Sequence, residues 1–528
     1  MVKRRLPAPE ARDAERRGPT SSRDDVIESS QPNSLPARPF RLMRTRHVVI
    51  KRKLKLWEAL ALSLGLMGPT LAVSGNGQGI IATVGKAVPL VFLLGFIGVA
   101  LVAYGFIRLT QRYNHAGSAY ALVGATLGPR AGFTAGFALL GTYLFFTVCT
   151  AAVFGAFLNA LLSSVFGAST SVGYGLAATA CLLMTGYLNT RDTSTVSRAL
   201  LAIEGLGIAA MLVLVVVILS KGGAESTGVD FTTFTPDRIG VGAVLAAVVA
   251  AFLSWAGFEA CAALGEETDN PLRNIPRALF GCVLLTGVLF VVVMFAQTIG
   301  FGTDAAGLAA FQSSGNTLGD LSETYIAHWF ALMVLVTAVL SAFASNLSAV
   351  MASARLAMAL ARDGFGPRQF AEIDPTHRIP RNAVLAAAAI GAVVNVATWL
   401  TGWPVMGTGD AAIDAYFYFA VVGATCLLFV YLLVEVAVFA AWRKGQISVR
   451  VPELALPALG GAFILVVIGY SVKDAAGLSP VFVAIAWVIV GVLVAIFAGK
   501  LADRIGVSLT KELAKAESSH SSADERHV

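Results

Sequence analysis

The feature that most constrains this chain is a succession of apolar stretches, each roughly twenty residues long, separated by short clusters of charged residues. A helix of about twenty residues crosses the hydrocarbon layer of a bilayer, which is roughly 30 Å thick. Backbone groups in that layer must bond internally, which favours helices, whereas membrane β-strands are shorter and alternate in polarity. Only 13% of the 528 residues are charged, about half of what is typical of a soluble protein. The sequence therefore predicts an all-α polytopic membrane protein.

We predict about twelve transmembrane helices within a membrane domain at residues 51–500. The predicted spans are 57–80, 87–108, 130–162, 172–189, 198–220, 239–264, 276–300, 324–361, 382–402, 413–441, 454–471 and 479–499. Residues 1–50 and 501–528 are polar, so we expect a disordered N-terminal tail and a C-terminal tail, both cytoplasmic.

The basic residues test this topology, because Lys and Arg are enriched in cytoplasmic loops. With the spans above, fourteen basic residues fall in loops on one side and only four on the other. The larger group comprises Arg108, Arg112, Arg130, Arg191, Arg198, Arg273, Arg277, Arg362, Arg368, Arg378, Arg381, Arg443, Lys444 and Arg450; the smaller comprises Lys86, Lys221, Arg238 and Lys473. We therefore expect a multi-pass protein of the cell (inner) membrane with both termini cytoplasmic. The net charge of +7 belongs to this pattern and does not indicate nucleic-acid binding.

Two predicted spans contain residues that interrupt helices. The first carries Gly68-Pro69-Thr70, where proline cannot donate its backbone bond, and a competing break at residues 74–77. The sixth carries Gly257 at mid-span, followed closely by Glu259. Interrupted helices at matched positions of two inverted repeats form the substrate site of many secondary transporters. We infer a five-plus-five inverted repeat (57–220 and 239–441) with two extra helices at 454–499, although a simple kink or close helix packing would also explain either break.

Three further segments carry a family resemblance. Residues 258–278 read FEACAALGEETDNPLRNIPRA, residues 353–367 read SARLAMALARDGFGP before RIPR at 378–381, and AGSAY at 116–120 precedes LGPRAGF at 127–133. These segments resemble signatures of amino acid–polyamine–organocation (APC) permeases, and with the span count the resemblance covers about residues 55–500.

The resemblance implies the leucine-transporter fold, alternating access, and coupling to protons or to exchange of substrate. It also implies that the unwound parts of spans one and six contact the substrate, an amino acid or related amine. In this chain those positions are Met67, Gly68, Pro69, Thr70, Ser254, Trp255, Ala256, Gly257 and Phe258. The chain departs from the family pattern in span five, which lacks the frequent lysine and carries Glu204 instead, and this leaves the coupling ion open.

Carboxyl groups inside spans are costly and are therefore candidates for function. Glu259 is the first candidate for coupling or gating, and it could also cap amide groups freed at the sixth-span break. Glu204 is the second, with a structural ion pair to Arg198 or Arg355 as the alternative. For Glu435 we favour a structural role.

Other polar or bulky residues have two interpretations each. Trp255 could act as a lid over the substrate or as a packing residue. In span eight, Ser345, Asn346 and Ser348 could contact substrate or a cation, but interhelical hydrogen bonds are the more frequent role of such groups.

The leading functional prediction is a proton-coupled transporter of an amino acid or amine. Exchange and sodium-coupled symport by the same fold remain open, and a membrane sensor is disfavoured because both tails are short and polar. We predict no enzyme activity, cofactor or metal site, because the six histidines are scattered, the five cysteines lack a C-x-x-C pair and no phosphate-binding loop is present. The predicted site has no carboxylate beyond Glu259 for a cationic side chain, which mildly favours a neutral amino acid.

Overall fold

The computed structural model describes residues 54–497, except 114–117, 168–170, 192–193, 237–238, 265–267, 363, 375, 378, 474 and 476. Both predicted tails lie outside this part, as do Ala116, Gly117, Gly265, Glu266, Glu267, Asp363 and Arg378 of the family-like segments.

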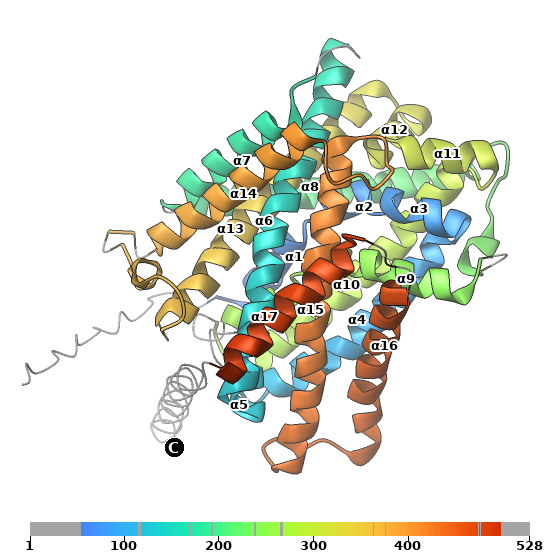
Figure 1. The fold of residues 1–528 in the computed structure, drawn as a ribbon. Helices are drawn as coiled ribbons and strands as arrows, with labels where there is room; N and C mark the ends of the chain where they lie inside the picture. Colours follow the sequence, from blue (N-terminus) through green and yellow to red (C-terminus); the bar gives the residue numbers. More distant parts are fainter. Residues whose placement is uncertain are drawn as a thin grey trace, which may run out of the picture. The chain divides into compact units, whose positions relative to one another are not determined.

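The regular elements of the described residues are helices, with one isolated bridge between Leu54 and Thr268 (Figure 1). This confirms the all-α prediction. The α-helices are α1 (Leu56–Met67), α2 (Pro69–Gly75), α3 (Gln78–Val84), α4 (Val88–Thr110), α5 (Ser118–Leu127), α6 (Pro129–Phe166), α7 (Tyr174–Asn189), α8 (Ser194–Ser220), α9 (Val241–Phe252), α10 (Pro271–Phe301), α11 (Ala305–Ser313), α12 (Thr317–Tyr325), α13 (His328–Arg362), α14 (Arg381–Thr401), α15 (Ala411–Arg443), α16 (Ala455–Lys473) and α17 (Pro480–Phe497). The 3₁₀ helices are η1 (Gly85–Ala87), η2 (Phe231–Phe234), η3 (Leu253–Trp255), η4 (Phe258–Leu264), η5 (Arg368–Ala371) and η6 (Val451–Leu454).

Ten helical stretches of the described chain are long and apolar enough to cross a membrane. They correspond to ten of the twelve predicted spans. At the position of the fourth predicted span, α7 has only 16 residues. At the sixth, the continuous apolar helix covers only Val241–Trp255. The number twelve and the inverted repeat therefore remain predictions.

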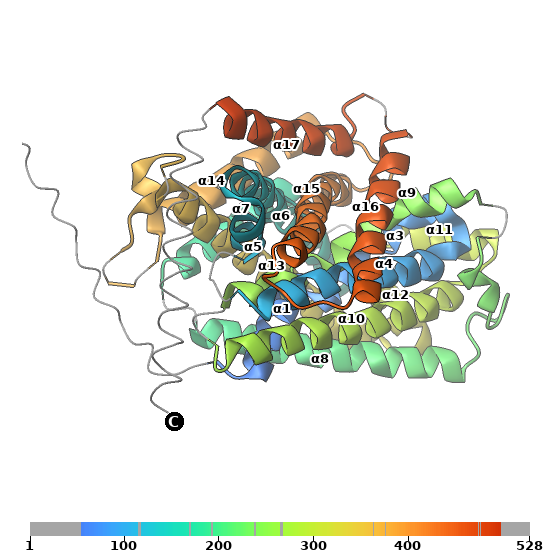
Figure 2. The same cartoon turned by 90° about the horizontal axis from the view of Figure 1, so that it is seen from below.

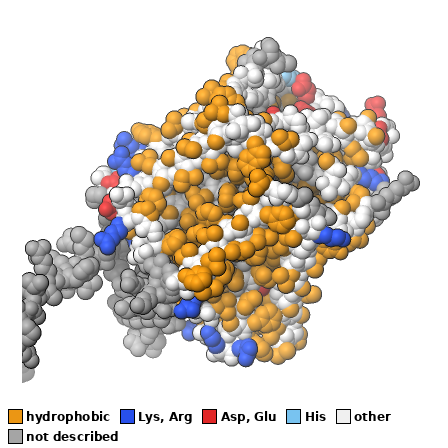
Figure 3. All heavy atoms as spheres, viewed as in Figure 1, with side chains coloured by type: hydrophobic (Ala, Val, Ile, Leu, Met, Phe, Trp, Pro, Cys, Tyr) orange, Lys and Arg blue, Asp and Glu red, His pale blue; other side chains and the backbone are white. Residues whose placement is uncertain are grey.

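The long helices pack on one another through their apolar faces. Helix α6 contacts both α13 and α15, and α4 contacts α10 (Figures 1 and 2). Hydrophobic side chains also cover much of the face seen in Figure 3, with Lys and Arg mostly near its margins. Apolar side chains such as Leu183, Val216 and Val393 are more than half exposed. An apolar interior together with an apolar outer surface is expected of helices that face lipid.

The turn between α5 and α6 explains one of the family-like segments. Gly128 joins the two helices with a φ of 99°, which glycine adopts without steric cost. On the first turn of α6, Gly132 faces the main chain of α5, and a Cβ added there would lie 2.7 Å from Gly124 Cα. Backbone atoms cannot rotate away, so this contact requires a residue without a side chain.

We predict that Gly132→Ala destabilises the protein by about 1–3 kcal/mol, because α6 must move away from α5 to accommodate the methyl group. The measurement is thermal unfolding of the purified protein in detergent. The control is Gly205→Ala on α8, where an added Cβ meets nothing within 4 Å. Equal melting temperatures for the two variants would contradict the prediction.

Candidate functional site

The first helix break lies at Gly68, the preferred position of the two predicted from sequence. Helix α1 ends at Met67, Gly68 has φ 56° and ψ 68°, and Pro69 begins α2. At the competing position, Asn76 and Gly77 keep right-handed helical backbone angles. The proline and the left-handed glycine together interrupt the hydrogen-bond ladder between α1 and α2.

The second break lies between α9 and η4. Helix α9 ends at Phe252 and continues as η3, after which Ala256 is extended and Gly257 has a φ of 104°. A Cβ at Gly257 would lie 2.8 Å from Cγ of Leu66 on α1. The two broken segments are therefore in direct contact.

Side-chain hydrogen bonds connect the two broken segments. The Ser63 hydroxyl of α1 donates to the Phe258 carbonyl at 3.0 Å and accepts from the Cys261 amide at 3.0 Å. Farther along, Asn76 Nδ2 donates to Ser254 Oγ at 2.6 Å, and the Tyr416 hydroxyl of α15 donates to Asn76 Oδ1 at 2.6 Å. These bonds satisfy backbone and side-chain groups that the interrupted helices leave open.

Glu204 caps the first break. Its Oε1 atom accepts a hydrogen bond from the Thr70 amide at 2.7 Å, and the neighbouring Leu71 amide donates to Ser341 Oγ of α13 at 3.1 Å. Within the described residues Glu204 forms no ion pair with Arg198 or Arg355, so the alternative of a structural salt bridge was wrong. A buried carboxylate on α8 thus holds an amide freed by the break.

Glu259 caps the second break. It is fully buried, and its Oε2 atom accepts from the Gly257 amide at 3.2 Å and from the Tyr431 hydroxyl at 2.9 Å. Its Oε1 atom has no hydrogen-bond partner in the described structure. The capping interpretation describes this geometry, and the free oxygen leaves Glu259 able to bind a proton.

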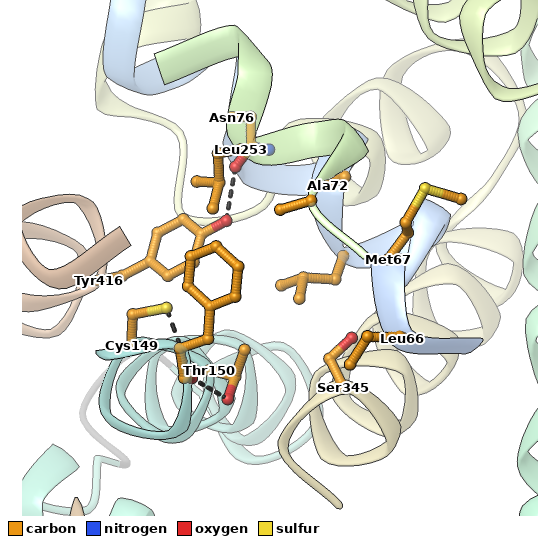
Figure 4. A pocket seen from close by; sticks show the side chains of 12 residues that line it. Leu66, Met67, Ala72, Asn76, Cys149, Thr150, Leu253, Ser345 and Tyr416 are labelled. Atoms are coloured by element: carbon orange, nitrogen blue, oxygen red, sulfur yellow. Dashed lines mark hydrogen bonds between the residues drawn. The ribbon is translucent and has the colours of Figure 1, made fainter. Parts of the chain in front are cut away.

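A cavity lies beside the first break, between α1, α2, the η3 segment, α6, α13 and α15 (Figure 4). In Figure 4, Tyr416 and Thr150 face it from one side and Met67 and Ser345 from the other. None of the described residues that line it carries a charge. The lining residues are Leu66, Met67, Leu71, Ala72, Asn76, Phe146, Cys149, Thr150, Leu253, Ala256, Ser345 and Tyr416.

Only part of the predicted site lines this cavity. Met67, Ala256 and Ser345 do so, whereas the other predicted residues of the two broken segments are not among its lining residues. Nine of the described lining residues were not predicted from sequence: Leu66, Leu71, Ala72 and Leu253 within the broken segments, and Asn76, Phe146, Cys149, Thr150 and Tyr416. No helix-breaking residue or intramembrane charge lies at Phe146, Cys149, Thr150 or Tyr416 to indicate a site there. Asn76 lies in the Ser74–Gly77 segment, which was the competing position of the first break.

Trp255 and Asn346 have packing roles in this structure. The Trp255 indole is 1% exposed and contacts the rings of Phe92 and Phe290, with centroids 5.8 and 5.3 Å away. Asn346 accepts from Thr185 Oγ1 at 2.7 Å and donates to the Thr147 carbonyl at 2.9 Å. The interhelical interpretation therefore describes Asn346, while Trp255 does not line the cavity.

A second cavity lies next to Glu204. Its walls come from α1, α8 and α13, and Glu204 and Ser348 are their polar members. The remaining lining residues are Gly65, Leu200, Leu201, Ala344 and Leu347. Among the described residues, no cluster of His, Cys, Asp or Glu could hold a metal ion here or elsewhere.

Comparisons with known proteins agree with this architecture. Residues 54–507 match the family described as "Amino acid permease". The putrescine importer PlaP of Escherichia coli K12, a low-affinity transporter, is 23% identical over 347 residues, covering 66% of this chain and 75% of its own. The branched-chain amino acid permease BcaP of Lactococcus lactis is 25% identical over 379 residues, covering 67% and 78%. The vacuolar cationic amino acid transporter 4 of Arabidopsis thaliana is 26% identical over 331 residues, covering 59% and 52%.

We predict that Gly68→Ala abolishes the function of the site and lowers the melting temperature. The left-handed backbone costs a residue with a side chain about 1–2 kcal/mol, and the added Cβ would collide with Ser345 Oγ and lie 3.2 Å from Ser341 Oγ. Thermal unfolding and ligand binding measure the two effects. The control is Gly65→Ala, one turn earlier, where the nearest atom is the flexible end of Leu201 at 3.0 Å. Wild-type behaviour of Gly68→Ala would show that the break tolerates a side chain.

Proposed function

The chain belongs to the amino acid permease family of the APC superfamily, and on this premise we propose that it carries its substrate by proton-coupled alternating access. Family membership makes it a multi-pass membrane transporter of an amino acid or amine, and not an enzyme. We further propose that the coupling ion is the proton and that α1–α8 and α9–α15 form an inverted repeat, with α16 and α17 outside it. We also propose that the chain lies in the cytoplasmic membrane with both termini inside.

The observation that carries the proposal is the hydrogen bond from the Thr70 amide to Glu204. The α-carboxylate of a substrate in the cavity would accept hydrogen bonds from the backbone amides at the break. These amides lie at the N-terminus of α2, where they have no carbonyl partner within a helix and carry partial positive charge. The Thr70 and Leu71 amides are already bonded, to Glu204 and Ser341. Glu204 and a substrate carboxylate therefore compete for the same donor.

Protonation of Glu204 resolves this competition. A hydrogen bond to a charged carboxylate is roughly twice as strong as one to a neutral group, so a protonated Glu204 releases the Thr70 amide more readily. Binding of a proton then raises the affinity for a substrate carboxylate, and by linkage substrate binding raises the affinity for the proton. This reciprocal preference is what proton symport requires.

Glu259 supplies a second exchangeable group at the second break. It bonds the Gly257 amide of the broken segment and Tyr431 of α15, so its protonation state affects the contact between these two elements. The contact would have to change if the site opened to alternate sides. We therefore assign Glu259 to gating and Glu204 to substrate-linked proton binding.

The cavity wall supports a neutral amino acid as substrate. Its polar members, Asn76, Thr150, Ser345 and Tyr416, carry no charge, and the rest of the wall is apolar. Such a wall suits an uncharged side chain, while the carboxylate and ammonium groups of the substrate can bond to the broken backbone. The relatives are named for putrescine, branched-chain and cationic amino acids, so their names do not decide the substrate.

We expect purified protein in liposomes to accumulate a neutral amino acid when the outside is made acidic. The measurement is uptake of labelled amino acids and amines under a pH gradient, under a sodium gradient, or with unlabelled substrate inside. Uptake that follows only the sodium gradient would show that sodium, and not the proton, is the coupling ion. Uptake that requires only internal substrate would indicate an exchanger.

We predict that Glu204→Gln lowers pH-driven accumulation about tenfold or more while exchange persists, because the amide still accepts a hydrogen bond but cannot bind the proton. In the wild type, apparent substrate affinity should increase as the pH falls, and in the variant it should not depend on pH. The control is Glu323→Gln, an exposed carboxylate on α12. A pH-dependent affinity in Glu204→Gln equal to that of the wild type would remove Glu204 from the coupling mechanism.

A further inference from the structure

A third intramembrane carboxyl group, Glu435 of α15, has no role in the mechanism above. Its side chain is 1% exposed, and neither of its oxygens has a hydrogen-bond partner among the described residues. The carboxyl group lies against Gly105 of α4, where an added Cβ would be 2.9 Å from both oxygens. On the other side, a Cβ at Gly461 of α16 would lie 3.9 Å from the Glu435 Cβ.

This environment is unfavourable for a structural carboxylate. A buried charge without a partner costs several kcal/mol in a membrane interior, so the group is held as a neutral carboxylic acid. The elements that contact it carry several titratable groups, and none of them bonds to Glu435 in the described part of the chain. These groups are Tyr104 and Arg108 on α4, Tyr470 and Lys473 on α16, and Asp414, Tyr416, Tyr418, Cys426, Tyr431 and Arg443 on α15.

Glu435 continues a line of exchangeable groups that starts at the second break. Tyr431, which donates to Glu259, lies four residues before Glu435 and thus on the same face of α15, about one turn away. Beyond Glu435, Gly105 is adjacent to Tyr104, whose hydroxyl donates to Glu453 Oε2 at 2.7 Å. Arg108 bonds both Tyr104 and Glu453. The line therefore leads from the broken helix to the end of α4 that carries Arg108, which is cytoplasmic in the proposed topology.

We propose that Glu435 is a proton-relay site between Glu259 and the cytoplasm, an inference that rests on the proposed proton coupling. Glu435, which is neutral at rest, first releases its proton toward the cytoplasm. The ionised Glu435 then accepts the hydroxyl proton of Tyr431 while the Tyr431 oxygen takes the proton from Glu259, so one proton leaves Glu259 and one leaves the protein. The gap between Tyr431 and Glu435 is crossed by rotation of the Glu435 side chain or through a water molecule admitted when the inner half opens.

The test compares Glu435→Gln and Glu435→Asp with the wild type in liposomes, with Glu323→Gln as the control. We expect Glu435→Gln to retain exchange of labelled for unlabelled substrate within about twofold, while pH-driven accumulation falls about tenfold or more. Glu435→Asp should recover part of the accumulation, because it restores an exchangeable proton at nearly the same place. A purely structural role would instead lower exchange and accumulation together.

Labelling with a hydrophobic carbodiimide gives a readout that does not depend on transport, because this reagent modifies protonated carboxyl groups in apolar surroundings. We expect mass spectrometry to find the label on Glu435 of the wild type. Accumulation by Glu435→Gln equal to that of the wild type, joint loss of both activities, or an unlabelled Glu435 would each overturn the relay and leave the proposed function intact. A wild type that does not respond to a pH gradient would overturn the proposed coupling and the relay with it.

Discussion

Hydrocarbon offers no hydrogen-bond partner to a peptide group, so every interruption of a membrane helix must be satisfied by another part of the protein. This constraint connects the two broken segments to the rest of the structure. At the first break the freed amides bond to Glu204 and Ser341. At the second, Glu259 accepts a hydrogen bond from the Gly257 amide and Ser63 accepts one from the Cys261 amide. The buried polar residues thus satisfy the backbone groups that the broken helices leave open.

The same bonds explain why movement at the site can be coupled to ion binding. A helix break that is capped by a neutral hydroxyl, such as that of Ser341, keeps its bond at any pH. A break capped by a carboxylate has a bond whose strength changes when a proton binds. Both breaks of this chain carry such a cap, in Glu204 and Glu259. Any rearrangement that exchanges these caps for substrate groups must then favour one protonation state over the other.

Sequence reasoning predicted the parts of this arrangement that depend on local pattern. The apolar runs predicted the helices, and Gly68-Pro69 together with Gly257 predicted the two breaks, because these residues act on their own backbone. The span count of twelve exceeded the ten stretches found because α7 is short and the sixth span is interrupted. The short helices α11 and α12 were not predicted, since they lie between apolar runs.

Contacts between distant segments could not be predicted in the same way. For Glu204, predicted as a coupling or gating residue, the alternative was an ion pair with an arginine close to the membrane surface, but its hydrogen-bond partner is the Thr70 amide, 134 residues away in sequence. Tyr416 and Thr150 line the cavity from the interiors of α15 and α6 and carry no local mark. Their role follows only from the packing of those helices around the break.

The glutamate in span five, where the family often has a lysine, is consistent with the electrostatics of the break. The Thr70 amide is a donor with partial positive charge, which a carboxylate can accept from and an ammonium group cannot. A lysine at this position would have to bond to carbonyl groups instead. Binding of one proton changes the charge by the same amount at either residue, from neutral to positive for lysine and from negative to neutral for glutamate. A transporter can therefore gain one positive charge for each bound proton with either residue at this position. Glutamate can replace lysine there provided that the backbone group facing the side chain is a donor rather than an acceptor.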